Sequence, residues 1–101
     1  MFYNVIKAKK LVNTEENKLE KKILLQNNEC CFDIFALEKD EIIGEHTSAV
    51  DGAIYILEGK IEIHFEAEKF TLEKGELLMF KKDATHKVLA LKDSKFFLIK
   101  V

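Results

Sequence analysis

The chain has 101 residues and carries 16 basic against 18 acidic side chains, a net charge of −2, with the lysines spread along the sequence. A chain of this length forms one domain with a core that needs no disulfide or metal to support it. The mixed charges predict neither a nucleic-acid partner nor a membrane partner. We find no long apolar run and no leader-like segment, so we expect a cytoplasmic protein.

The N-terminal part predicts little regular structure. Residues 2–6 are apolar and aromatic enough for a short strand, and residues 7–18 form a polar connector with room for one helical turn. We expect residues 1–29, this strand and connector, to pack on a barrel formed by residues 30–101, the two parts making one domain.

From residue 21 onward, apolar residues tend to recur at every second position, which is the period of a strand with one buried face. The clearest case is residues 60–66, where three apolar side chains alternate with charged residues and His64. Roughly ten short strands and no long helix predict an all-β sandwich or barrel. The other strands are expected within residues 23–26, 30–37, 42–43, 54–57, 70–72, 77–80, 86–90 and 96–101, with turns at 27–28, 38–41, 67–68 and 74–75.

Two cysteines, Cys30 and Cys31, are adjacent in the chain. Neighbours on a strand point to opposite faces, so a disulfide between them would be strained. No partner set for a metal site accompanies them. We expect both to be half-buried strand residues without a redox function.

Two histidines stand in similar local settings. His46 follows Gly44 and precedes a polar loop and a strand that ends in a Glu-Gly turn, whereas His86 follows a glycine turn, an apolar strand and a polar corner. We expect the two side chains to face one pocket from neighbouring strands. His64 alternates with apolar residues, so we expect it to face solvent.

Residues 30 to 100 resemble the cupin family, small β-barrels of jelly-roll type, also called double-stranded β-helices. In the family's first motif, G-x5-H-x-H-x3-4-E-x6-G, the last glycine corresponds to Gly59, and the Tyr-Ile-Leu-Glu-Gly run of residues 55–59 is similar to the family's Tyr-Val-Leu-Glu-Gly. The family's first histidine falls on His46, its second on Ser48 and its glutamate on Gly52.

The family's second motif, G-x5-P-x-G-x2-H-x3-N, begins at Gly75 and places its histidine on His86. The metal-binding members use three histidines and one glutamate, so the resemblance implies that two of four ligands remain here. The pattern around Glu45-His46-Thr47 also resembles a group of short single-domain cupins that have no clear assigned activity. The motif positions that differ are Lys81 and Thr85 at the proline-favouring places, Asp83 at the inner glycine and Ala90 at the closing asparagine.

Three interpretations of the site stay open. In the one that we expect, His46, Ser48 and His86 bind a small polar molecule and at most a weakly held metal, because neutral histidine both donates and accepts hydrogen bonds. In the second, His46 and His86 are ligands of zinc, nickel, iron or manganese in a metal-dependent oxygenase or isomerase. In the third, the histidines are structural and the barrel is a dimerising module. The sequence does not decide whether the protein is an enzyme.

A catalytic metal would need a third protein donor. Asp51 is the best candidate, one residue before the place of the family's glutamate, but this offset directs its side chain away from the pocket unless the loop bulges. Glu45 fails the same test relative to His46. Tyr55 could join a histidine in acid–base isomerisation, but the sequence does not show which face of its strand points into the barrel.

Aromatic residues are more numerous than one small barrel interior needs, and residues 54–57 and 96–101 are apolar on both faces. Cupins commonly pair through strands on the outer side of the barrel. We therefore expect a homodimer. The aromatic residues concerned include Phe32, Phe35, Phe70, Phe80, Phe96 and Phe97.

Overall fold

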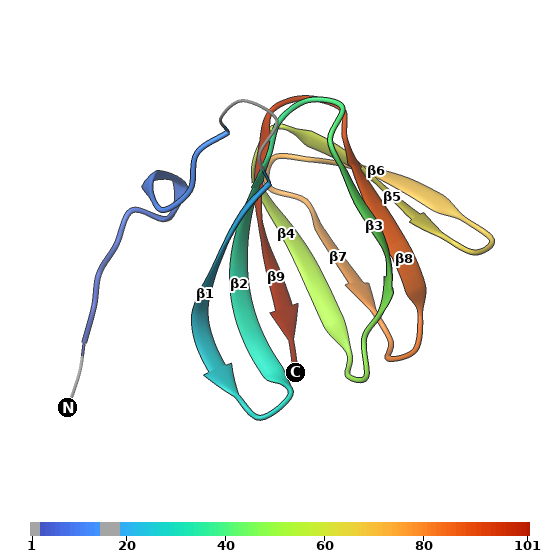
Figure 1. The fold of residues 1–101 in the computed structure, drawn as a ribbon, viewed down its shortest axis with the longest axis horizontal. Coiled ribbons are helices and arrows are strands. Elements are labelled where there is room, and N and C mark those ends of the chain that lie inside the picture. The colour runs from blue at the N-terminus through green and yellow to red at the C-terminus, as the bar shows by residue number, and fades with distance from the viewer. Residues whose placement is uncertain (1–2, 15–18) are drawn as a thin grey trace.

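The computed structural model describes residues 3–14 and 19–101 (Figure 1). Within these ranges the chain forms one 3-10 turn, η1 (Ala8–Lys10), and nine strands. None of the helical segments in the described part could cross a membrane. The strands are β1 (Glu20–Asn27), β2 (Cys30–Leu37), β3 (Ile42–Thr47), β4 (Gly52–Glu58), β5 (Lys60–Phe65), β6 (Lys69–Glu73), β7 (Leu77–Phe80), β8 (Thr85–Ala90) and β9 (Ser94–Lys100).

The strands make two antiparallel sheets that face each other (Figure 1). One sheet has the order β1-β2-β9-β4-β7 and the other the order β3-β8-β5-β6. Strands far apart in the sequence are therefore neighbours, with β9 between β2 and β4 and β8 between β3 and β5. The all-β jelly-roll barrel predicted from the sequence is confirmed.

The core lies between the sheets because each strand turns alternate residues inward. On β4, Ile54 and Ile56 are buried in the core, whereas Tyr55 and Leu57 lie on the outer face and are only partly buried. Strand β5 alternates in the same way. The buried core consists of Phe35, Leu37, Ile54, Ile56, Ile61, Ile63, Leu72, Phe80, Val88, Ala90, Phe96 and Leu98.

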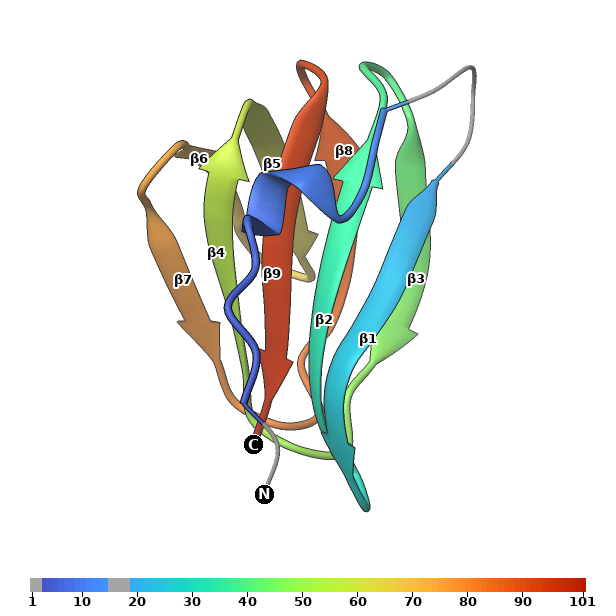
Figure 2. The same ribbon diagram turned by 90° about the vertical axis from the view of Figure 1, so that its left-hand side faces the viewer.

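A second apolar cluster covers part of the outer face of the five-stranded sheet. Val12, just after η1, is fully buried against Ile34 and Ala36, and Leu57 and Phe97 pack at its margin. In Figure 2 the N-terminal segment passes in front of this sheet. Some of the apolar side chains on the outer faces of β4 and β9 are thus covered by the chain's own N-terminal segment.

Several predicted boundaries need correction. Residues 3–6 form no strand, and Val5 is 99% exposed with no strand beside it, whereas residue 2 lies outside the described ranges. Strand β1 pairs with β2 along residues 20–27, so its turn falls at residues 28–29, where Asn28 has a φ of 55°. Strand β3 does not end at Ile43 but continues through Gly44 to Thr47. Its pairing with β8 shifts register between Ile43 and His46, and the strand does not bend away there. The predicted helical turn and the strand at residues 30–37 are confirmed.

Two glycines hold tight turns in the left-handed region, where a side chain is strained. Gly59, between β4 and β5, has a φ of 87°, and a Cβ there would overlap the backbone of Asp93 and Ser94. Gly75, before β7, has a φ of 86° but open space around it. Because their φ angles match, comparing substitutions at the two positions separates the free-energy cost of backbone strain from that of a steric clash.

We expect Gly59→Ala to lower the free energy of unfolding more than Gly75→Ala does. Backbone strain alone costs about 1–2 kcal/mol at Gly75, and the overlap with Asp93 adds to this cost at Gly59. Gly44→Ala is the control, since Gly44 has open space and no positive φ. Urea unfolding of the three variants measures the order, and equal losses for Gly59→Ala and Gly75→Ala would contradict it.

Candidate functional site

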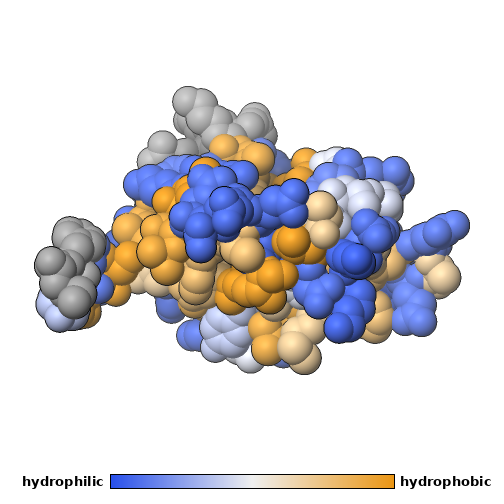
Figure 3. Space-filling view, turned by 90° about the horizontal axis from the view of Figure 1, so that it is seen from below, coloured by the Kyte–Doolittle hydropathy of each residue, from blue (hydrophilic) through white to orange (hydrophobic). Residues whose placement is uncertain are grey.

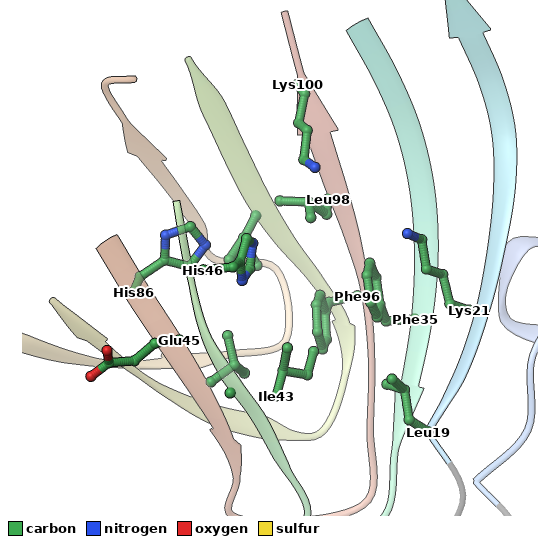
Figure 4. A pocket seen from close by; sticks show the side chains of 13 residues that line it. Leu19, Lys21, Phe35, Ile43, Glu45, His46, His86, Phe96, Leu98 and Lys100 are labelled. Carbon is green, nitrogen blue, oxygen red and sulfur yellow. The ribbon is translucent and has the colours of Figure 1, made fainter. Parts of the chain in front are cut away.

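A pocket of about 450 Å³ lies between the two sheets (Figure 4). It is lined from both edge strands on one side of the barrel, β1 of the larger sheet and β3 of the smaller one. Most of the lining is apolar, with two histidines and two lysines among it. The lining residues are Leu19, Lys21, Phe35, Ile43, Gly44, Glu45, His46, Ile54, His86, Val88, Phe96, Leu98 and Lys100.

One irregularity in β3 brings the two histidines together. Ile43 lies opposite Val88 on β8, and a regular antiparallel pairing would then set Glu45 opposite His86. The register shifts by one residue between Ile43 and His46, so His46 takes that place instead. The two imidazole rings lie 4.2 Å apart between centroids, with their planes at 63°.

His86 has a defined tautomer and one nitrogen without a partner. Its Nδ1 lies 2.9 Å from the carbonyl oxygen of Ala84, which can only accept, so Nδ1 carries the hydrogen. In the neutral ring Nε2 is then a bare acceptor. His86 is 1% exposed, and Nε2 has no hydrogen-bond partner among the described residues. The rings of Phe80 and Phe65 lie 4.7 and 5.8 Å from its centroid, so its surroundings are apolar.

His46 is kept neutral by its surroundings. Burial lowers its pKa from the ordinary value of 6.5, and the electrostatic influence of the neighbouring His86, Lys100 and Lys21 lowers it further. A backbone hydrogen bond with Gly44 acts in the opposite direction. A neutral imidazole at this position can donate to or accept from a bound molecule.

Two lysines stand at the mouth of the pocket, one from β1 and one from β9 (Figure 4). The Lys21 ammonium lies 3.7 Å from the carboxylate of buried Asp33 and 5.6 Å from the centre of the Phe35 ring. Reasoning from the sequence missed both lysines. The available signal was the alternation of β9, in which Lys100 falls on the same face as Phe96 and Leu98.

The structure does not bring Ser48 into this pocket, which corrects the expectation that it lies beside the histidines. Its side chain is buried, but the hydroxyl donates to the Val50 carbonyl oxygen at 2.8 Å and accepts from the Val50 amide at 3.2 Å. Ser48 therefore closes its own loop and faces a neighbouring hollow.

The two carboxylates considered as metal donors do not point toward the histidines. Asp51 accepts from the Lys82 amide at 2.9 Å and lies 3.5 Å from the Lys81 ammonium, and the Lys82 amide holds its pKa below the usual value. Glu45 points away from both imidazoles (Figure 4). Within residues 3–14 and 19–101, no group of three or more His, Cys, Asp or Glu side chains could hold a metal ion. The donors present do not fit a catalytic metal centre.

The remaining candidates lie outside the pocket. Tyr55 is on the outer face of the larger sheet, where its ring is 6.5 Å from that of Phe97, so it cannot act with His46 or His86. His64 lies on the outer face of the smaller sheet, half-buried and bonded to Glu62. Neither Cys30, which is exposed, nor Cys31, which is half-buried, forms a disulfide.

Comparisons with known proteins give one family and several similar folds. The family model described as "Cupin domain" matches residues 33–101. A conserved Streptococcus pyogenes protein of unknown function superposes with a TM-score of 0.92 at 24% identity, over 100% of this chain and 89% of that one. A cupin superfamily protein from Desulfitobacterium hafniense gives 0.87 at 23% identity, over 91% and 84% of the two chains.

KdgF from a Halomonas species has a similar fold, with a TM-score of 0.74 at 19% identity over 90% of this chain and 89% of that one. The search of curated proteins gave no match. At these identities the solved structures establish the fold alone.

The lowered pKa of His46 predicts a loss of stability in acid. Below pH 6.5 the unfolded chain protonates His46 while the folded protein resists protonation, so the unfolded state binds more protons. The free energy of unfolding therefore falls as pH drops from about 6.5 toward the lower folded pKa. Urea unfolding across this range measures the slope, which His46→Gln should reduce. A slope unchanged in His46→Gln would contradict the assignment.

Proposed function

Since the chain belongs to the cupin family by the match over residues 33–101, we propose that it binds a small organic molecule in the pocket between its sheets. The observation that carries this proposal is the buried Nε2 of His86, an acceptor without a partner in the described part of the chain. A ligand hydroxyl or N–H that donates to this nitrogen completes its hydrogen bonding. Whether a chemical step follows binding is a separate question.

The size and lining of the pocket support the same proposal. A volume of about 450 Å³ lies within the usual range for small-molecule sites. Such sites combine an apolar lining with a few polar groups that orient the ligand. Here the polar groups are the two histidines and the two lysines, and the apolar groups include Phe35, Phe96 and Leu98.

A purely structural role accounts less well for His86. A buried acceptor left without a hydrogen bond costs about 1–3 kcal/mol, and an apolar side chain at this position would avoid that cost. This free-energy cost is explained if a ligand donates a hydrogen bond to Nε2.

A metal-dependent oxygenase or isomerase is the weaker candidate. Zinc, nickel, iron or manganese would find two imidazoles, no third donor among the residues that the structure describes, and the positive charges of Lys21 and Lys100 beside them. We propose that any such binding is weak. The cytoplasmic location expected from the sequence stays a prediction.

We also propose that the protein forms a homodimer through the part of the outer face of the five-stranded sheet that the N-terminal segment does not cover. The N-terminal segment packs over Ile34 and Ala36, whereas Met79 on edge strand β7 is 75% exposed. Together with Ala53, Ile99 and Val101 it lines a shallow apolar hollow beside Asp51 and Lys81. Seen from below, the molecule shows apolar areas next to charged ones (Figure 3), a mixture that is common at protein interfaces.

The ligand proposal predicts that compounds with an apolar body and a hydroxyl or amide donor raise the melting temperature of the wild type. His86→Phe keeps an aromatic ring but removes Nε2, so we expect affinity to fall by about tenfold, the effect of one lost hydrogen bond. His64→Gln, on the outer face, is the matched control and should respond like the wild type. The melting temperature of each protein is measured with every compound of a metabolite panel.

Two results would contradict the ligand proposal. One is a panel in which no compound shifts the wild type, and the other is a shift that His86→Phe retains in full. Elemental analysis of protein purified without added metal distinguishes the metal-dependent enzyme from the metal-free binding pocket. Stoichiometric metal that disappears when His46 and His86 are both replaced by Ala would favour it.

The dimer proposal predicts a mass of two chains by light scattering at micromolar concentration. Met79→Glu introduces a charge into the apolar hollow and should shift the mass toward one chain. Ile42→Glu is the control, because Ile42 is an apolar residue that is 64% exposed on β3, at the edge of the other sheet. A monomeric wild type, or a dimer that survives Met79→Glu, would overturn the proposal.

A further inference from the structure

Lys100 occupies a position that β-strand geometry reserves for a core residue. Alternate residues of β9 point between the sheets, and the two before it in this series, Phe96 and Leu98, are buried in the core. Lys100 continues the series at the mouth of the pocket and is half-buried. A cation on the inner face of a sheet carries a desolvation cost unless an anion accompanies it.

No residue of the described ranges supplies that anion. Lys100 forms no ion pair or hydrogen bond there, whereas the neighbouring Lys21 is paired with Asp33 at 3.7 Å. Its charge nevertheless acts on the pocket lining, because it helps to lower the pKa of His46. In Figure 4 the Lys100 side chain projects from β9 on the side of Leu98, and it lines the pocket with the two histidines.

The charges around the pocket leave one positive charge uncompensated. Glu45 is the only acidic residue among the described lining residues, and its carboxylate points away from the histidines (Figure 4). The charge of Asp33 is offset by Lys21. The field that a bound molecule meets is therefore that of Lys100, beside two imidazoles of which His46 is held neutral.

We infer that the pocket takes an organic monoanion, with a carboxylate against Lys100, an apolar body between the sheets, and a hydroxyl that donates to Nε2 of His86. The apolar body lies against Phe35, Ile54 and Phe96, in the depth of the pocket. The chemical class is a hydroxy carboxylic acid with an aliphatic or aromatic chain. This inference rests on the proposed function and adds the charge of the ligand to it.

The test compares three probes of equal chain length: 3-hydroxyoctanoate, its neutral amide 3-hydroxyoctanamide, and octanoate. Titration calorimetry at low salt should show the hydroxy acid binding wild type about tenfold more tightly than the amide, as one charge-assisted hydrogen bond predicts. Octanoate should bind more weakly than the hydroxy acid, because it lacks the donor for His86. Added salt should reduce the preference for the acid over the amide.

Lys100→Met keeps most of the side-chain stem and removes the charge, so it should abolish the preference for the acid while leaving the affinity for the amide within about twofold. Lys69→Met is the matched control on β6, at the far edge of the other sheet, and should behave like the wild type. Thermal unfolding of each variant checks that the barrel is intact.

Each further outcome decides between the two proposals. Equal binding of acid and amide by the wild type, or a preference that survives in Lys100→Met, overturns the anion inference and leaves the proposed pocket function standing. So does binding of neutral panel compounds when neither hydroxy probe binds. If no compound binds, charged or neutral, the proposed function falls as well.

Discussion

The candidate site depends on one extra residue in β3. With regular pairing from Ile43 onward, Glu45 would lie opposite His86 and His46 would point out of the barrel. The one-residue shift exchanges these two side chains, so the pocket receives an imidazole and the carboxylate faces outward (Figure 4). A carboxylate beside His86 would favour a cation, whereas a second neutral imidazole favours a molecule that hydrogen-bonds. The register of the β3 backbone thus determines which side chain, His46 or Glu45, faces His86.

The barrel then determines how each polar group can act. Phe65 and Phe80 surround His86, and the Ala84 carbonyl fixes its tautomer, so one bare nitrogen is presented in an apolar setting. His46 lies nearer the mouth, where burial and neighbouring charges keep it neutral. Lys21 is held by Asp33, which leaves Lys100 as the charge that a ligand can use. Position along the pocket therefore separates an inner acceptor from an outer cation.

The sequence predicted the fold well because alternation is a local signal that the barrel requires of every strand. It also placed His46 and His86 in one pocket, and it predicted that Asp51 and Glu45 would point elsewhere. It failed for Ser48, whose hydroxyl is used within its own loop, since a loop has no period from which to read a direction. It missed Lys100 because charged strand residues are normally assigned to solvent, although its spacing from Phe96 and Leu98 shows the inward face. The strand predicted at residues 2–6 failed over 3–6 because apolar composition does not supply a pairing partner.

A metal site of the kind that the resembling family has would need more here than two further ligands. Gly52 stands where the resembling family has its glutamate, and the space beside it is filled by the ring of Phe80, which a Cβ at Gly52 would overlap. The same ring packs 4.7 Å from His86. Placing a carboxylate at Gly52 would therefore displace Phe80 and disturb the surroundings of His86 at once. The Phe80 ring, Gly52 and the unpartnered Nε2 of His86 thus depend on one another. Together they suit a ligand that has an apolar body and a hydrogen-bond donor better than they suit a coordinated ion.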